Sequence, residues 1–145
     1  MRVYVDGVFD LFHYGHAQML ERARALGDEL WVGVVTDQDA RSYKRSPVLT
    51  YAERAAAVRA CRHADRVVEA QLVLDSAFIE RHGIHKVVHG DDSNQADFFA
   101  VPLEMGIMHY LPYTRGISTT DIINRILRRH VITPCAAPRD TQSRS

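Results

Sequence analysis

Short apolar runs alternate with segments of helical spacing along most of this chain. Apolar runs that predict strands lie at 3–6, 30–35, 66–69, 86–89 and 107–111. The run at 30–35 is apolar at nearly every position, which is typical of a parallel strand that is buried on both faces. Helical spacing and capping signals predict helices at 16–26, 50–62, 75–83, 95–104 and 121–130.

The order of these elements predicts an α/β fold. Strand and helix alternate five times, which favours a parallel sheet with right-handed crossovers and helices on both faces. The polar residues 38–49 are interpreted as a long connection at the carboxyl end of the second strand. Residues 1–131 are predicted to form one domain, and residues 132–145, rich in Pro, Ala, Arg, Ser and Thr, a disordered tail or an interdomain linker.

Size and charge narrow the class of protein. A length of 145 residues suits one domain with a core of its own. Lys and Arg number 18, as do Asp and Glu, and no basic stripe stands out, which argues against nucleic acid as a partner. Cys61 and Cys135 lack metal-ligand spacing, no apolar run approaches membrane-spanning length, and no signal peptide precedes the first strand. We therefore expect a cytoplasmic protein without membrane insertion.

The most informative stretch follows the first predicted strand and reads G-V-F-D-L-F-H-Y-G-H from residue 7 to residue 16. It turns from a strand into a helix, whose N-terminus offers N–H groups and a positive dipole end to a phosphate. His13 and His16 are placed to reach that phosphate. Gly7 and Gly15 stand where the backbone must turn sharply or approach a ligand closely. The alternative is that both histidines are surface residues of a first helical turn.

Further polar residues follow other predicted strands. Lys44 and Arg45 come after the second strand, Asp91 and Asp92 after the fourth, and the segment 115–120 after the fifth. Because the carboxyl ends of parallel strands share one edge, one site can collect all of them. Its basic groups and helix N-termini would face a polyanion, and its carboxylates would contact a sugar or base, or hold a metal.

Four segments together resemble the cytidylyltransferase family, which includes the choline-phosphate, ethanolamine-phosphate and glycerol-3-phosphate cytidylyltransferases. They are the stretch at 7–16, K-R-S-P-V-L-T-Y-A-E-R, H-G-D-D and R-G-I-S-T-T-D-I-I, and the similarity spans roughly residues 2–130. H-x-G-H marks the wider nucleotidyltransferase superfamily, whereas G-I-S-T-T is specific for the branch that uses CTP. The resemblance implies a doubly wound, Rossmann-like sheet of five parallel strands in the order 3-2-1-4-5, and a homodimer.

The resemblance also implies a reaction. A phosphorylated small alcohol and CTP would give a CDP-alcohol and pyrophosphate by in-line attack on the α-phosphate, with Mg²⁺ bound to the CTP. The implied catalytic residues are His13, His16 and Lys44. The implied nucleotide-binding residues are Gly7, Val8, Phe9, Gly15, Asp91, Arg115, Gly116, Ile117, Ser118 and Thr119. The implied acceptor-binding residues are Asp6, Asp10, Tyr14 and Arg54, and no protein side chain is assigned to a metal.

Several of these residues have simpler interpretations. Lys44 could be a solvated loop charge, and Asp91 could belong to a plain turn. Arg54 could merely pair with a neighbouring carboxylate, and Ser118 could be only the N-cap of the last helix. The family usually carries an arginine where this chain has Tyr113, so either Arg115 or Arg45 would have to reach the triphosphate instead.

The acceptor is less well defined. A carboxylate at Asp6 suits a cationic amine, but Trp31 falls inside a strand, and Leu72 and Val73 stand where the choline enzymes carry a tryptophan. This favours phosphoethanolamine, and leaves open glycerol 3-phosphate, phosphocholine or a phosphonate such as 2-hydroxyethylphosphonate. Two other functions are conceivable, an adenylyltransferase, against which G-I-S-T-T argues, and a non-catalytic nucleotide-binding module.

Overall fold

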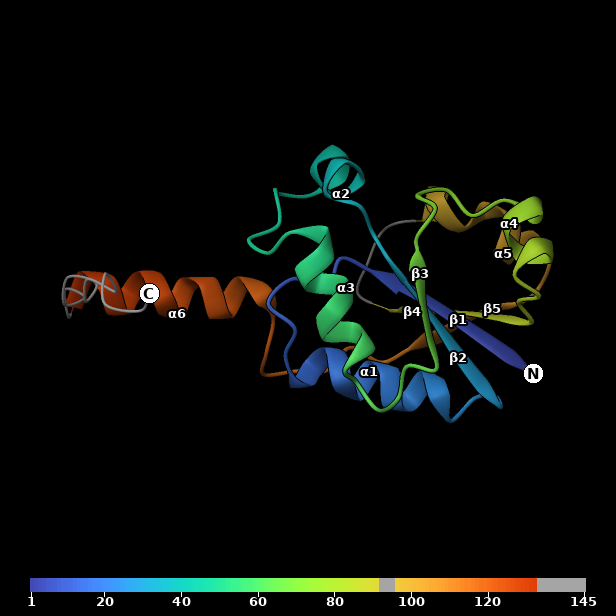
Figure 1. Ribbon diagram of the computed structural model, residues 1–145, viewed down its shortest axis with the longest axis horizontal. Helices are drawn as coiled ribbons and strands as arrows, with labels where there is room; N and C mark the ends of the chain where they lie inside the picture. The colour runs from blue at the N-terminus through green and yellow to red at the C-terminus, as the bar shows by residue number, and fades with distance from the viewer. Residues whose placement is uncertain (92–95, 133–145) are drawn as a thin grey trace, which may run out of the picture.

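The strands form one parallel sheet in the computed structural model, which describes residues 1–91 and 96–132 (Figure 1). Within these residues the strands are β1 Arg2–Gly7, β2 Glu29–Val34, β3 Arg66–Glu69, β4 Lys86–Gly90 and β5 Met108–Leu111. They are hydrogen-bonded in the order β3-β2-β1-β4-β5, and every neighbouring pair is parallel. The predicted doubly wound α/β sheet of order 3-2-1-4-5 is confirmed.

The helices occupy the connections between the strands. They are α1 Tyr14–Arg24, α2 Asp37–Tyr43, α3 Tyr51–Arg59, α4 Ser76–Arg81, the 3-10 helix η1 Ala96–Phe99, α5 Ala100–Glu104 and α6 Thr119–Ile132. Each predicted helix is present. The capping box expected at the start of α3 is also present, since Thr50 and Glu53 cap each other's backbone N–H groups.

Helix α2 corrects the prediction of a long connection over residues 38–49. The side chain of Thr36 accepts a hydrogen bond from Asp39 N, and the acidic residues of the first turn suit a helix N-terminus. Only Ala40 of this helix is buried, so its sequence carries almost no apolar period. The connection without helix begins at Lys44, and the tail predicted from residue 132 lies outside the described residues except for Ile132.

The two faces of the sheet are covered by different helices because side chains alternate along each strand. Val3 and Val5 of β1 pack into a core cluster with residues of α1 and α3. Tyr4 points to the opposite face, where it packs with Phe78 of α4 and with Phe99, next to α5. This arrangement leaves the carboxyl ends of β1 and β4 open, next to the beginnings of α1 and α6.

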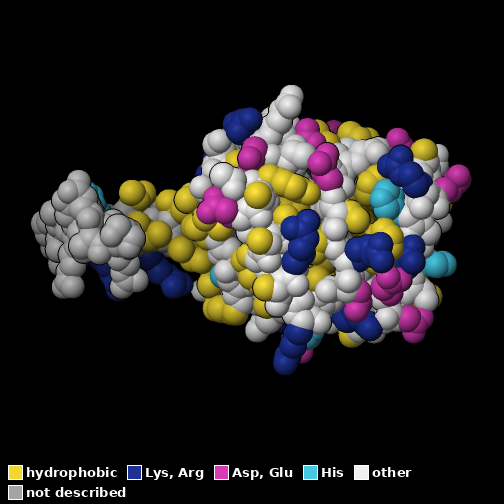
Figure 2. Space-filling model, in the orientation of Figure 1, with side chains coloured by type: hydrophobic (Ala, Val, Ile, Leu, Met, Phe, Trp, Pro, Cys, Tyr) yellow, Lys and Arg dark blue, Asp and Glu magenta, His cyan; other side chains and the backbone are white. Residues whose placement is uncertain are grey.

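Helix α6 projects away from the sheet instead of covering it (Figure 1). Figure 2 shows apolar side chains along this projection, and Ile126 and Leu127 are each 58% exposed. Within the described residues, no helix combines the length and the apolar character that a membrane span requires.

Candidate functional site

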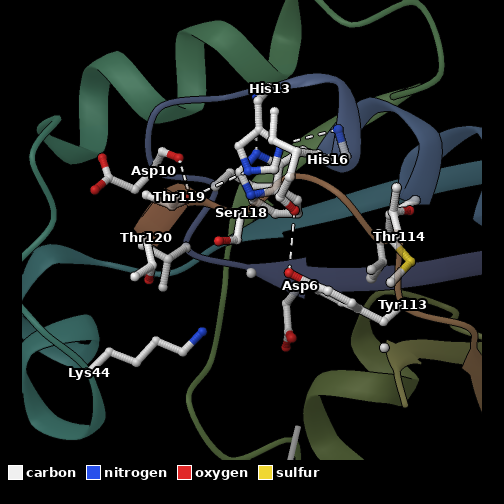
Figure 3. Close-up of a pocket in the computed structure, with 18 of the residues that line it drawn as sticks. Asp6, Asp10, His13, His16, Lys44, Tyr113, Thr114, Ser118, Thr119 and Thr120 are labelled. Carbon is white, nitrogen blue, oxygen red and sulfur yellow. Dashed lines mark hydrogen bonds between the residues drawn. The ribbon is translucent and has the colours of Figure 1, made fainter. Parts of the chain in front are cut away.

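A cavity of about 620 Å³ opens at the carboxyl ends of β1 and β4 (Figure 3). Its described lining residues come from four parts of the chain and are Val5–Asp10, His13, Gly15, His16, Met19, Lys44, Arg45, Pro47, His89, Gly90, Tyr113, Thr114 and Ile117–Thr120. The beginnings of α1 and α6 therefore face the same space, as the sequence predicted for loops that follow parallel strands.

The two predicted histidines lie side by side at the beginning of α1. Their rings are stacked with centroids 3.8 Å apart. His13 is the N-cap of α1, and its Nδ1 accepts from Gly15 N at 3.1 Å. His16 Nδ1 accepts from His13 N at 3.2 Å, which completes a capping box. Because both Nδ1 atoms accept, each ring carries its proton on Nε2 and presents a hydrogen-bond donor.

Burial keeps these histidines neutral. It lowers the pKa of His13, and burial together with the charges of His13 and Lys44 lowers the pKa of His16 to about 3. Phe9 packs edge-on against the His16 ring with centroids 5.4 Å apart. Near pH 7 the pair therefore offers two neutral N–H donors to an oxyanion.

The loop that shapes this site is bent tightly. Phe9 and Leu11 both adopt positive φ angles, of 55° and 50°, which cost L-residues free energy. Phe9 is almost fully buried, so its packing holds the bend in place. Gly15 has no room for a side chain, since a Cβ there would lie 2.9 Å from the His13 ring and 3.0 Å from Ile117 Cγ2. This close contact brings the beginning of α1 against the segment before α6.

Asp6 and Lys44 bring opposite charges into the cavity. The Lys44 side chain extends toward Asp6 (Figure 3). Burial raises the pKa of Asp6 to about 7, although the charge of Lys44 opposes the rise. A cation that enters the cavity would stabilise the ionised form of Asp6 and so lower its pKa.

The start of α6 contributes hydroxyl groups and backbone N–H groups. Ser118 Oγ accepts from Asp121 N at 3.0 Å, so the predicted N-cap is present. Thr119 Oγ1 donates to Asp10 O at 2.9 Å and lies 3.5 Å from His13 Nε2. Gly116 precedes this turn with a φ of 91°, a conformation that favours glycine. His13 and Thr119 thus join the openings of the two helices.

Asp10 lines the cavity, but its carboxylate is engaged elsewhere. Oδ2 accepts from Val48 N at 2.8 Å and Oδ1 from Leu49 N at 2.9 Å, and the residue is 6% exposed. This geometry argues against the acceptor-binding role predicted for Asp10. Its carboxylate instead anchors the connection that carries Lys44.

Arg54 does not reach the cavity. It is 0% exposed, and its guanidinium donates to Val8 O at 2.7 Å, Val35 O at 2.8 Å and Leu49 O at 3.2 Å. It also forms an ion pair with Asp37 at 2.7 Å. The simpler interpretation, pairing with a neighbouring carboxylate, describes Arg54 in this structure. The acceptor-binding role stays a prediction, and the burial of Arg54 argues against it. The physical role of Arg54 is to fasten the ends of β1 and β2 to the connection at 44–50.

Four other predicted residues lie outside the cavity lining. Asp91 Oδ1 accepts from Tyr113 N at 3.0 Å and so positions the segment after β5. Tyr14 is 53% exposed, and Arg115 and Gly116 lie in the turn before α6. Asp92 lies outside the described residues. The remaining predicted nucleotide-binding residues, Gly7, Val8, Phe9, Gly15, Ile117, Ser118 and Thr119, all line the cavity.

Sequence reasoning missed several lining residues. His89 is the second-last residue of β4, and its ring packs against Phe99 in a tilted arrangement with ring centroids 4.7 Å apart. Its place at the carboxyl end of a predicted strand was a signal that could have identified it. Met19, Pro47 and Thr114 carry no comparable signal. Within residues 1–91 and 96–132, no group of three or more His, Cys, Asp or Glu residues is arranged to hold a metal ion.

A family model and individual relatives both point to the same protein family. The family model described as cytidylyltransferase-like matches residues 4–125. The chain is 41% identical over 132 residues to an ethanolamine-phosphate cytidylyltransferase of Dictyostelium discoideum, covering 88% of this chain and 37% of that protein. It is 40% identical over 135 residues to choline-phosphate cytidylyltransferase A of Rattus norvegicus, again covering 88% of this chain and 37% of that protein.

A solved structure agrees with the fold. The lipopolysaccharide core biosynthesis protein of Thermoplasma volcanium superposes with a TM-score of 0.67 at 25% identity, over 81% of this chain and 98% of that one. The chain spans somewhat more than a third of the length of the curated relatives that it matches. On the match over residues 4–125 and these identities, the chain belongs to the cytidylyltransferase-like family.

Proposed function

We propose that this chain is a CTP-dependent cytidylyltransferase that joins CMP to a small phosphorylated alcohol. The observation that carries the proposal is the meeting of two helix openings in one cavity, where Thr119 Oγ1 lies 3.5 Å from His13 Nε2. Two helix N-termini and two neutral imidazole donors suit a triphosphate better than they suit a single anion.

The chemistry follows from these groups. A phosphate oxygen of the acceptor attacks the α-phosphorus in line, the bond from that phosphorus to the bridging oxygen breaks, and pyrophosphate leaves with the electron pair. His13 and His16 donate hydrogen bonds to the α-phosphate oxygens, on which negative charge develops. Lys44 bridges the two reacting phosphates. Preorganised donors of this kind each lower such barriers by about 3 kcal/mol.

We propose that Mg²⁺ enters with the nucleotide. The described residues that line the cavity include only two carboxylates, and both oxygens of Asp10 already accept backbone N–H groups. Mg²⁺ commonly keeps water ligands and binds through substrate phosphates, so it needs no cage of protein side chains. When bound, it would neutralise charge on the departing pyrophosphate.

For the acceptor we propose phosphoethanolamine. Asp6 offers a carboxylate that a primary ammonium group can pair with, while the described aromatic side chains of the lining, apart from histidines, are Phe9 and Tyr113. Because Phe9 is almost fully buried, Tyr113 alone makes a poor cage for a trimethylammonium group. Relatives named for ethanolamine phosphate and for choline phosphate are similarly close, so the acceptor depends on this local chemistry.

We further propose a homodimer in the cytoplasm. The apolar side chains of Ile126 and Leu127 on α6 suit pairing with a second copy, and Cys61 is a free thiol, as expected in a reducing compartment. Light scattering on the purified chain should give twice the monomer mass. The substitutions Ile126→Ser and Leu127→Ser should reduce the measured mass to that of one monomer. A monomer mass for the unchanged chain would contradict the dimer.

Pyrophosphate release tests the proposed reaction. CTP and Mg²⁺ would be combined with phosphoethanolamine, phosphocholine, glycerol 3-phosphate or 2-hydroxyethylphosphonate, and ATP, GTP and UTP would replace CTP in parallel. We expect the highest kcat/KM with CTP and phosphoethanolamine. Release with ATP only would support an adenylyltransferase, and CTP binding without release would support a non-catalytic nucleotide-binding module.

A further inference from the structure

Positive charge is scarce in the cavity. Among its described lining residues, Lys44 and Arg45 are the permanently charged cations. The neighbouring histidines are neutral, because burial lowers the pKa of each, so they supply donors without charge. A nucleoside triphosphate carries several negative charges, and its terminal phosphates would need a cation besides the lysine that serves the reacting phosphates.

Arg45 lies where such a cation is needed. Although it follows Lys44 directly in the chain, its Nη2 donates to Thr120 Oγ1 at 3.1 Å, in the first turn of α6. The guanidinium is thereby held beside the helix opening that offers N–H groups to an anion. Within the described residues this is the only hydrogen bond of the Arg45 side chain, so Nε and Nη1 have no protein partner there.

No other arginine takes this place in the described structure. Arg115 lies outside the cavity lining. Tyr113 does line the cavity, but its Oη donates to Ile117 O at 3.3 Å and its backbone N donates to Asp91. The position at which family resemblance leads us to expect an arginine therefore carries a neutral phenol that is tied to its own loop.

We propose that Arg45 binds the terminal phosphates of the nucleotide, the part that leaves as pyrophosphate, and so selects a triphosphate over a monophosphate. The proposal rests on the CTP site proposed above and names the residue that fills one part of it. A guanidinium presents a planar fork of donors that suits two phosphate oxygens at once. One connection would then deliver two cations, Lys44 to the reacting phosphates and Arg45 to the leaving group.

Calorimetric titrations of CTP and of CMP, each with Mg²⁺, separate this role from general damage to the site. The variants are Arg45→Gln and Arg45→Lys, with Arg41→Gln as the matched control, because Arg41 is an exposed arginine of α2 outside the cavity lining. Arg45→Gln should weaken CTP binding about 10- to 100-fold, since it removes charge-assisted hydrogen bonds, and leave CMP binding within about twofold. Arg45→Lys should retain part of the CTP affinity, and Arg41→Gln all of it.

The variant Arg115→Gln tests the alternative that Arg115 binds the terminal phosphates. It should lose less CTP affinity than Arg45→Gln does. Equal CTP affinity in Arg45→Gln and the unchanged chain would overturn the proposal, as would equal losses for CTP and CMP or a larger loss in Arg115→Gln. Because Arg45 is exposed, the variants should keep their melting temperatures. If the unchanged chain binds no CTP, the proposed function itself fails, which is a separate result.

Discussion

Replacing Asp6 by Asn should raise stability in a pH-dependent manner while it impairs acceptor binding. Asp6 lies near the carboxyl end of β1 and lines the cavity, and burial raises its pKa from 3.8 to about 7. The native state therefore holds this proton more tightly than the unfolded chain does. The resulting stabilisation is complete below pH 3.8 and is lost as pH rises through 7. Asn cannot ionise, so the stability of the variant should not fall with rising pH for this reason.

The size of the effect follows from the pKa. Between pH 5 and pH 8, a group with a native pKa of about 7 loses about 2.7 kcal/mol, because the loss of 1.36 kcal/mol for each pH unit stops once the pH has passed the native pKa. Because the side chain keeps some contact with solvent in the cavity, we expect about half of this, or ~1.5 kcal/mol. For a domain of this size, ~1.5 kcal/mol corresponds to a change of about 5 °C in melting temperature.

The assay is a series of thermal melts at pH 5, 6, 7 and 8 on the unchanged chain and on Asp6→Asn. The difference in Tm between the variant and the unchanged chain should grow by about 5 °C from pH 5 to pH 8. Asp97→Asn serves as the control, because Asp97 is an exposed carboxylate outside the cavity lining, and its difference should stay constant. A Tm difference for Asp6→Asn that does not change with pH would refute the burial argument.

Kinetics on the same variant test the acceptor. If Asp6 pairs with the ammonium of phosphoethanolamine, Asp6→Asn should raise the KM for the acceptor about 10-fold or more and leave the KM for CTP nearly unchanged. In the unchanged chain, kcat/KM for the acceptor should fall below about pH 7, as Asp6 takes up a proton. The acceptor phosphate also titrates near pH 6, and the fall in kcat/KM that this titration causes should persist in the variant. An unchanged acceptor KM would favour glycerol 3-phosphate.

Three further substitutions probe the catalytic donors and the core. His16→Ala should lower kcat at least ~100-fold with an unchanged circular dichroism spectrum, and equal turnover would contradict the mechanism. Arg54→Ala should lower the free energy of unfolding, measured by urea denaturation, by about 3–5 kcal/mol, because it leaves three backbone carbonyl groups, that of Val35 buried, and Asp37 without their partner. Tyr4→Phe should stabilise the fold by about 1 kcal/mol, because Tyr4 Oη is buried without a hydrogen-bond partner among the described residues. Unfolding would be followed by Trp31 fluorescence, and a lower stability in the variant would contradict this reasoning.

The fold could be predicted because its signal is spread over many residues. The apolar run at 30–35 and the alternation of elements each favour a parallel sheet, and the structure pairs β2 with strands on both sides. Helix α2 escaped prediction because only Ala40 among its residues is buried, so no apolar stripe marks it. A short polar helix is visible only through caps such as Thr36, and capping residues also occur in turns.

The site could be predicted in part. Residues at the carboxyl ends of strands and at helix N-termini, such as His13, His16 and Ser118, converge because the topology brings those ends together. Asp10 and Arg54 were assigned to the acceptor because the resemblance to the cytidylyltransferase family implies that role. Sequence shows what a side chain can bind, but it does not show whether backbone groups already occupy it, and here both residues are engaged by backbone atoms.

These two buried charges have a consequence for the chemistry. Asp10 accepts from the N–H groups of Val48 and Leu49, while Arg54 donates to Leu49 O, so one short connection is held from both sides. That connection begins at Lys44. In the proposed reaction, the Lys44 amine would have to be placed within a few tenths of an ångström to serve a phosphoryl-type transition state. Since Asp10 O also accepts from Thr119 Oγ1, the same residue links the lysine-bearing connection to the opening of α6. The connection that carries the cations for the proposed triphosphate is thus held by Asp10 and Arg54, whose own charged groups are engaged by the protein.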